Sequence, residues 1–230
     1  MHLKQTENLR TAANDFSTAY GASISSAVEA NSTLLVHWLS YLNSFHRTGV
    51  ADSLLNAVGS SIREVAGVAS LGLGRQALLS LRGQVDLMLA WLYFKDHAVE
   101  WSHVNQTADG FKLKKELLQY LDQHVPRFGH RIGILREIAT RKELDPYRLL
   151  SAHVHAQSDP VLPDVVDLKD LVRPEAVCKE CAQVAFEVAE FLNDVLFAVY
   201  LPSWASLPEV VRSGLNARFQ SGDQRKSFFS

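Results

Sequence analysis

The stretch PEAVCKECAQVAFEVAEFLNDVLFAVY, residues 174–200, decides the fold of this chain. Its apolar side chains recur at steps of three and four residues, a spacing that places them in one stripe along a helix. The stripe consists of Val177, Cys181, Val184, Val188, Leu192, Val195 and Val199. Pro202 stops the pattern, because proline has no N–H for the helical hydrogen bond. The spacing predicts one long helix that buries the same side over its whole length.

The same periodicity continues through most of the chain, and the alternation typical of strands is nearly absent. We therefore predict an all-α fold, a helical bundle. The predicted helices cover about 6–20, 26–45, 52–68, 75–104, 111–124, 127–141, 146–157, 174–200 and 208–219. Those near 75–104, 127–141, 146–157 and 174–200 are predicted to form a four-helix core.

No linker long enough to separate two domains interrupts these helices. We expect a single domain over residues 1–220, with the bundle core at about 75–201 and an N-terminal extension of helices over 1–70. The last residues, 221–230, are predicted to form a flexible tail, although Phe228 and Phe229 give it an apolar end that suits docking on a partner.

The composition indicates a substantial core and a divided charge. Of 230 residues, 47% are hydrophobic and 21% are charged, and the formal net charge is −2. That balance argues against a protein that coats nucleic acid through charge alone. Residues 112–148 nevertheless hold nine Lys/Arg and five Asp/Glu, a net of +4, and residues 159–194 hold three and nine, a net of −6. A local basic surface is therefore compatible with the composition.

Neither the cysteines nor the apolar runs point to a special compartment. Cys178 and Cys181 lie in the long predicted helix, so we interpret them as core residues, with redox or zinc chemistry as the less favoured alternative. The polar N-terminus contains no signal-peptide core, and the longest apolar run, 87–94, is far shorter than the roughly 20 residues that cross a bilayer. We expect a cytoplasmic protein without a membrane span, a metal or a cofactor.

The most specific chemistry lies in DPYRLLSAHVHAQS, residues 145–158. On a helix, Arg148, Ser151 and His155 are spaced i, i+3 and i+7 and share one face. His155 returns to within about 20° of Arg148, whereas His153 lies about 140° away. A fixed guanidinium beside an imidazole that titrates near neutral pH is suited to handling phosphate. These residues form the candidate site, with His155 as the better partner of Arg148 and His153 as the alternative.

At this helix the chain resembles the HEPN superfamily of small all-α bundles, many of which are metal-independent endoribonucleases of toxin–antitoxin and phage-defence systems. The mark of that family is an arginine followed four to six residues later by a histidine. Arg148-Leu-Leu-Ser-Ala-His153 and the span from Arg148 to His155 both match it. Residues 75–101 resemble the early bundle helix of uncharacterised HEPN-like bacterial proteins, so the likeness covers about 75–200. Leu149 stands where many members have a polar residue.

The resemblance implies a reaction, a substrate and an assembly. The reaction is RNA cleavage without a metal, in which an imidazole removes the proton of the ribose 2′-OH and Arg148 holds the phosphate. Ser151 would orient the phosphate, and the products would be a 2′,3′-cyclic phosphate and a 5′-OH end. The assembly is a homodimer whose two arginine/histidine helices face each other. A partner protein such as an antitoxin or another defence subunit is also implied.

Two further carboxylates and two other functions are weighed against this site. Asp96 and Glu100 are predicted to share a helix face at i, i+4, where they would pair with Arg148, Arg75 or Arg136 or support the candidate site. The alternatives to the nuclease are a non-catalytic helical subunit that binds a partner or a nucleotide, and a metal-dependent hydrolase that uses this pair of carboxylates. Cleavage of RNA in the presence of EDTA would separate the three.

Overall fold

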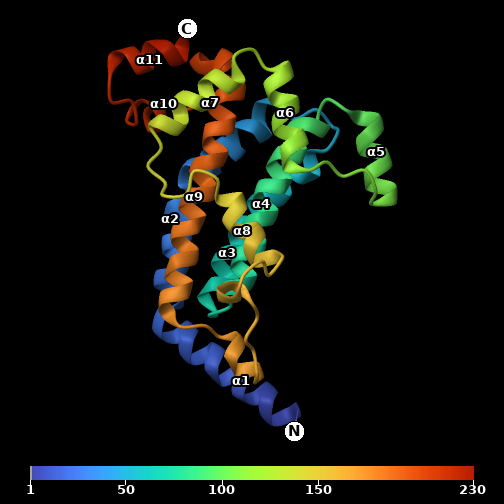
Figure 1. Ribbon diagram of the computed structural model, residues 1–230, viewed down its shortest axis with the longest axis vertical. Coiled ribbons are helices and arrows are strands. Elements are labelled where there is room, and N and C mark those ends of the chain that lie inside the picture. Colours follow the sequence, from blue (N-terminus) through green and yellow to red (C-terminus); the bar gives the residue numbers. More distant parts are fainter. Residues whose placement is uncertain (1) are drawn as a thin grey trace. The chain divides into compact units, whose positions relative to one another are not determined.

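The computed structural model of the protein describes residues 2–230, without the side chains of His2 and Pro160. The fold is an all-α helical bundle, as predicted, and the described residues contain no strand (Figure 1). The α-helices are α1 (His2–Phe16), α2 (Ala22–Phe45), α3 (Asp52–Ser70), α4 (Gly74–Phe94), α5 (Ala98–Thr107), α6 (Lys114–His124), α7 (Phe128–Glu137), α8 (Pro146–Val154), α9 (Glu175–Tyr200), α10 (Glu209–Asn216) and α11 (Gly222–Phe229).

Short helical turns join some of these helices. They are the π-helical turn η1 (Ser17–Gly21) and the 3-10 helices η2 (Asp159–Val161), η3 (Leu168–Leu171) and η4 (Leu201–Ser206). None of the helices in the described part is both long and apolar enough to cross a membrane.

The chain forms two compact units, each built from three separate segments. Unit 1 consists of the residues up to Ser32, Ser60–Gln84 and Asp145–Val188. Unit 2 consists of Thr33–Gly59, Val85–Leu144 and Ala189–Ser230. Helices α2, α3, α4 and α9 contribute residues to both units.

In unit 1 the first two helices follow one another without the break that was predicted at Gly21. The π-helical turn η1 carries α1 directly into α2. Gly21 is buried, and a Cβ atom there would lie 2.9 Å from the Ser17 hydroxyl oxygen and 3.0 Å from the carbonyl oxygen of Ser70. The glycine therefore permits close packing against the end of α3, and the extra residue of a π turn keeps the helix going.

A tight turn at Gly72 connects α3 to α4 and holds the chain that enters α9. Gly72 has a φ of +83°, and its carbonyl oxygen accepts the Arg173 N–H at 2.8 Å. A Cβ atom there would lie 2.5 Å from a methyl carbon of Val172, so only glycine fits. The 3-10 helix η3 of the same segment packs beside α1 (Figure 1).

The two cysteines are core residues of unit 1, as predicted. Both are buried in α9, and the Cys181 thiol donates to the carbonyl oxygen of Gly74 at 3.4 Å. Burial raises the pKa of Cys178 to about 11 and that of Cys181 to about 12. Both thiols are therefore protonated near neutral pH and unreactive.

In unit 2 the helix predicted over 75–104 is interrupted, because α4 ends at Phe94 and α5 begins at Ala98. The Nδ1 atom of His97 lies 2.7 Å from the carbonyl oxygen of Tyr93, the acceptor that a continuing helix would offer to the His97 N–H. The imidazole ring of His97 also stacks on the Tyr93 ring, with the ring centres 4.0 Å apart and 2° between the planes. The imidazole of His97 thus replaces a helical hydrogen bond and ends α4.

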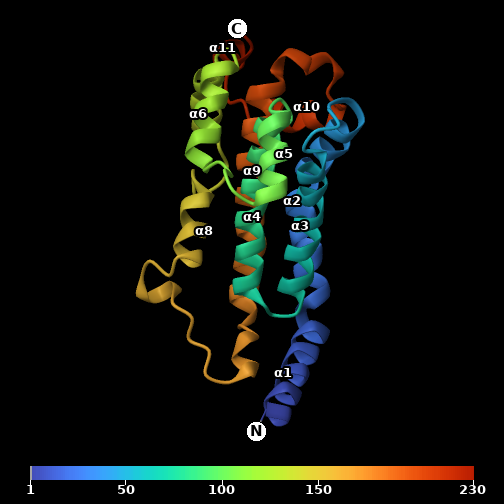
Figure 2. The same cartoon turned by 90° about the vertical axis from the view of Figure 1, so that its right-hand side faces the viewer.

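The last residues were predicted to form a flexible tail, but Gly222–Phe229 forms helix α11 in unit 2. Phe228 is buried, and the Phe229 ring packs edge-on against Trp204 at 4.7 Å. α11 lies beside α7 (Figure 1), and Figure 2 shows it next to the C-terminus. The apolar end of the tail is therefore satisfied within the chain itself.

Two acidic residues of α9 in unit 2, Glu190 and Asp194, belong to a buried cluster of charged side chains. One oxygen of Asp194 accepts from Arg141 at 2.6 Å, and the other accepts from Arg218 at 2.6 Å. Glu190 accepts from Arg141 at 3.1 Å and from the Thr140 hydroxyl at 2.7 Å. None of the four charged side chains is more than 10% exposed. Two cations offset two anions, so each charge of this cluster has a partner of opposite sign.

Removal of Arg141 from this cluster should be costly. We expect Arg141→Met to lower the free energy of unfolding by about 3–5 kcal/mol, because it leaves two buried carboxylates with one cation. Arg10→Met is the matched control; Arg10 is 78% exposed and pairs with Glu7 at 2.8 Å, so a change within about 0.5 kcal/mol is expected. Urea unfolding measures both, and equal losses would contradict the buried cluster.

Candidate functional site

Helix α8 carries the candidate residues and is shorter than the predicted helix over 146–157. It begins with Pro146 in its first turn and ends at Val154, and Ala156 follows with a positive φ of 48°. The His155 N–H still donates to the Ser151 carbonyl oxygen at 3.0 Å. The helical spacing therefore extends to His155, although that residue closes the helix.

The two sides of α8 differ in burial. Leu150 is fully buried, whereas Arg148 and His155 are both exposed. Since the spacing holds as far as the His155 amide, these two residues share the solvent-facing side, about 20° apart around the axis. Arg148 is not a free cation, because it has an interaction partner within the described chain. Ser151 is half-buried at the edge of the exposed side.

Two arginines of α4 contact α8, and sequence reasoning did not assign either of them to the site. Arg82 donates to the Tyr147 hydroxyl at 2.8 Å and to the Ser151 hydroxyl at 3.4 Å, and its guanidinium lies 4.9 Å from the centre of the Tyr147 ring. Arg75 donates to the carbonyl oxygen of His153 at 2.9 Å. The first half of α4 and α8 are therefore antiparallel. The signal for this contact is the i, i+7 spacing of two arginines on a largely apolar helix.

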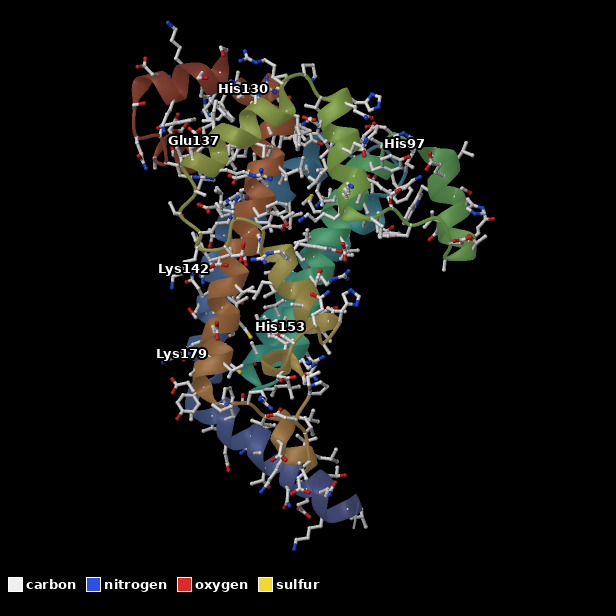
Figure 3. All side chains as sticks on the ribbon, viewed as in Figure 1. His97, His130, Glu137, Lys142, His153 and Lys179 are labelled. Atoms are coloured by element: carbon white, nitrogen blue, oxygen red, sulfur yellow. The ribbon has the colours of Figure 1, made fainter. Side chains whose placement is uncertain are left out.

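His153 faces away from the exposed side and lines a pocket of unit 1 (labelled in Figure 3). Burial lowers the pKa of its imidazole, and the positive charge of Arg75 lowers that pKa further, against the opposite effect of Glu180. The ring is therefore neutral near pH 7. Sequence reasoning placed it toward a neighbouring helix, and the structure adds the pocket.

That pocket has a volume of about 250 Å³ and is mostly apolar. The segment between α8 and α9 forms one wall, and Arg75 fixes it there by donating to the carbonyl oxygen of Val161 at 2.9 Å. Its aliphatic lining includes Leu78, Val161, Leu162, Val165, Leu171 and Val177. This concave, mostly apolar surface suits a small ligand with an apolar body.

Asp96 and Glu100 lie in unit 2 and do not share a helix face, because the break after α4 separates them. Asp96 pairs with Lys95 at 2.6 Å. Glu100 accepts from the Tyr93 hydroxyl at 3.0 Å and pairs with Lys112 at 3.2 Å, in place of the expected arginines. Burial opposes ionisation of Glu100, but these two donors outweigh it, so its pKa is lowered. A supporting role for the two carboxylates at α8 stays a prediction.

Within residues 2–230, no group of three His, Cys, Asp or Glu side chains is arranged to hold a metal ion. Comparison of the chain with protein-family models, curated proteins and solved structures finds no match. Function is therefore inferred from α8 and the side chains around it.

The lowered pKa of His153 predicts a pH dependence of stability. The folded protein favours the neutral ring, so the contribution of His153 is complete above the ordinary value of 6.5 and is lost as the pH falls from there through the folded-state pKa. We expect His153→Gln to lose less stability on acidification than the wild type does.

Urea unfolding at about pH 7.5 and about pH 5.5 measures this difference. His155→Gln controls for the removal of an imidazole from the same helix. An equal loss in the wild type and in His153→Gln would contradict the buried position of His153.

Proposed function

We propose that the protein is a metal-independent endoribonuclease of the HEPN type, acting in bacterial anti-phage defence or in a toxin–antitoxin system. One observation carries the proposal: α8 presents Arg148 and His155 together on its exposed side. A guanidinium and an imidazole on one face can bind a phosphate and move a proton without a metal ion.

In this proposal the two side chains divide the reaction. The neutral imidazole of His155 removes the proton of the 2′-OH, and the 2′ oxygen attacks the adjacent phosphorus. The P–O5′ bond breaks and the 5′ oxygen takes up a proton, which leaves a 2′,3′-cyclic phosphate and a 5′-OH end. Arg148 stabilises the charge that develops on the phosphate oxygens. Ser151, which Arg82 contacts at 3.4 Å, orients the phosphate from the edge of the same side.

The proposal includes a cytoplasmic homodimer in which two α8 helices line one RNA-binding cleft. A two-fold axis would supply two copies of each group from a single short helix. The exposed position of both Arg148 and His155 leaves them accessible to a second copy. An antitoxin or another defence subunit would bind the same face.

A second candidate function is a non-catalytic subunit that binds a small molecule, a nucleotide or a partner. The pocket beside His153 favours it, since neither Arg148 nor His155 lines that mostly apolar pocket.

Incubation of the purified protein with total RNA in EDTA tests the nuclease. We expect the wild type to cleave, and Arg148→Ala and His155→Ala each to slow cleavage by about 100-fold or more, the usual effect of losing a charge-stabilising group or a catalytic base. His153→Ala tests the other histidine, and Lys179→Ala, an exposed residue of α9, is the surface control. Mass spectrometry of the products should find 2′,3′-cyclic phosphates.

Each contrary result has a definite meaning. Cleavage that EDTA abolishes would replace the proposal with a metal-dependent hydrolase. Cleavage that survives in Arg148→Ala and His155→Ala would place the active site elsewhere. If the wild-type dimer does not cleave RNA, the second candidate function, a non-catalytic ligand-binding subunit, replaces the nuclease.

A further inference from the structure

The pocket of unit 1 has two cations on its wall, and they are held in different ways. Arg75 is fixed by the carbonyl oxygens of His153 and Val161, each at 2.9 Å. These two bonds use two of the five N–H groups of a guanidinium. Arg173 pairs with Asp164, at 2.6 and 3.4 Å. The guanidinium of Arg75 is therefore held by the main chain, whereas that of Arg173 is paired with one carboxylate.

The carboxylate of Asp164 is easily displaced from Arg173. Its side chain is 69% exposed, and an ion pair so open to water contributes little to stability. The Arg173 guanidinium is 32% exposed and stays at the pocket wall. Another carboxylate with an apolar body could take the place of Asp164, since burial of that body would offset the lost pair.

The walls of the pocket define the body of such a ligand. Leucine, valine and proline side chains form the apolar part of the walls, and the His153 imidazole is the one aromatic ring among the lining residues, which include no phenylalanine, tyrosine or tryptophan. Nucleobases are usually stacked on aromatic rings, so this lining favours an aliphatic chain. The volume of about 250 Å³ is slightly below the usual range for ligand pockets, which limits the ligand to a short chain.

We propose that this pocket binds a short aliphatic carboxylate, with its hydrocarbon chain against Leu78, Leu171 and Val177 and its carboxylate at Arg173 in place of Asp164. The bound anion also lies near Arg75. The site is independent of RNA cleavage, because neither Arg148 nor His155 lines it.

The proposal has a consequence for pH. The charged groups that line the pocket with His153 are Arg75 on α4, Glu180 on α9, and Arg173 and Asp164 in the segment between α8 and α9. A bound anion favours the protonated imidazole, which Arg75 and burial disfavour in the free protein. Affinity for the carboxylate should therefore rise as the pH falls from about 8 to about 6.

Calorimetric titration of the full chain with hexanoate, and with hexanamide as its neutral isostere, tests the site. We expect saturable binding of hexanoate, about tenfold tighter than that of hexanamide, because only the carboxylate forms the ion pair. Acetate, which lacks the chain, should bind far more weakly.

Two substitutions should change the affinity for hexanoate in opposite directions. Arg173→Gln should weaken hexanoate binding about tenfold and leave hexanamide binding nearly unchanged. Asp164→Asn removes the competing carboxylate and should tighten hexanoate binding, by up to about fivefold. Arg10→Gln, on the exposed surface of α1, is the control and should have no effect. Asp164 is exposed, so its substitution leaves the fold intact.

The inference is overturned by equal affinities for hexanoate and hexanamide, by the absence of saturable binding, or by weaker hexanoate binding in Asp164→Asn. Arg148→Ala should retain full hexanoate binding. A failure of RNA cleavage and a failure of this site would therefore be seen in separate experiments.

Discussion

Two arginines on one side of α4, Arg75 and Arg82, determine how α8 is held. Arg82 bonds Tyr147 and Ser151 near the start of α8, and Arg75 bonds the carbonyl oxygen of His153 near its end. A helix of nine residues is too short to be stable alone in water. Its position therefore comes from these contacts and from the burial of Leu150. With these contacts made to α4, the side of α8 that carries Arg148 and His155 is left exposed.

Unit 2 is stabilised by a different kind of polar contact. In unit 1 Arg75 and Arg82 bond hydroxyl and carbonyl oxygens at partly exposed sites. In unit 2 Arg141 and Arg218 pair with Glu190 and Asp194 away from water. Buried ion pairs of this kind stabilise a fold only modestly, but they penalise any arrangement that separates the partners. The cluster thus explains how α9 holds Glu190 and Asp194 away from water.

Long helices were predictable from the sequence because periodic burial determines them. The apolar stripe over 174–200 corresponds to α9, Glu175–Tyr200, and the third predicted helix corresponds to α3, Asp52–Ser70. Single local bonds were not predictable. The imidazole of His97 takes one carbonyl oxygen and ends α4, and Gly21 continues a helix where its usual role is to end one. The spacing of apolar residues predicts neither the end of α4 nor the continuous helix at Gly21.

The same distinction applies to the candidate site. The common side of Arg148 and His155 follows from spacing within one helix and was predicted. The pocket beside His153 depends on contacts such as that between Arg75 and Val161, which are far apart in sequence, and no periodicity within one helix reveals them. The only sign of those contacts in the sequence is the spacing of Arg75 and Arg82, seven residues apart on α4.

The orientation of α8 can be measured directly through its two histidines. Diethyl pyrocarbonate modifies accessible neutral imidazoles, and fragmentation of the modified peptide distinguishes His153 from His155. Because His155 is exposed and His153 is half-buried in the pocket wall, His155 should react faster. Equal rates in the wild type, or faster reaction of His153, would show that α8 is turned the other way and would remove the basis for the proposed site.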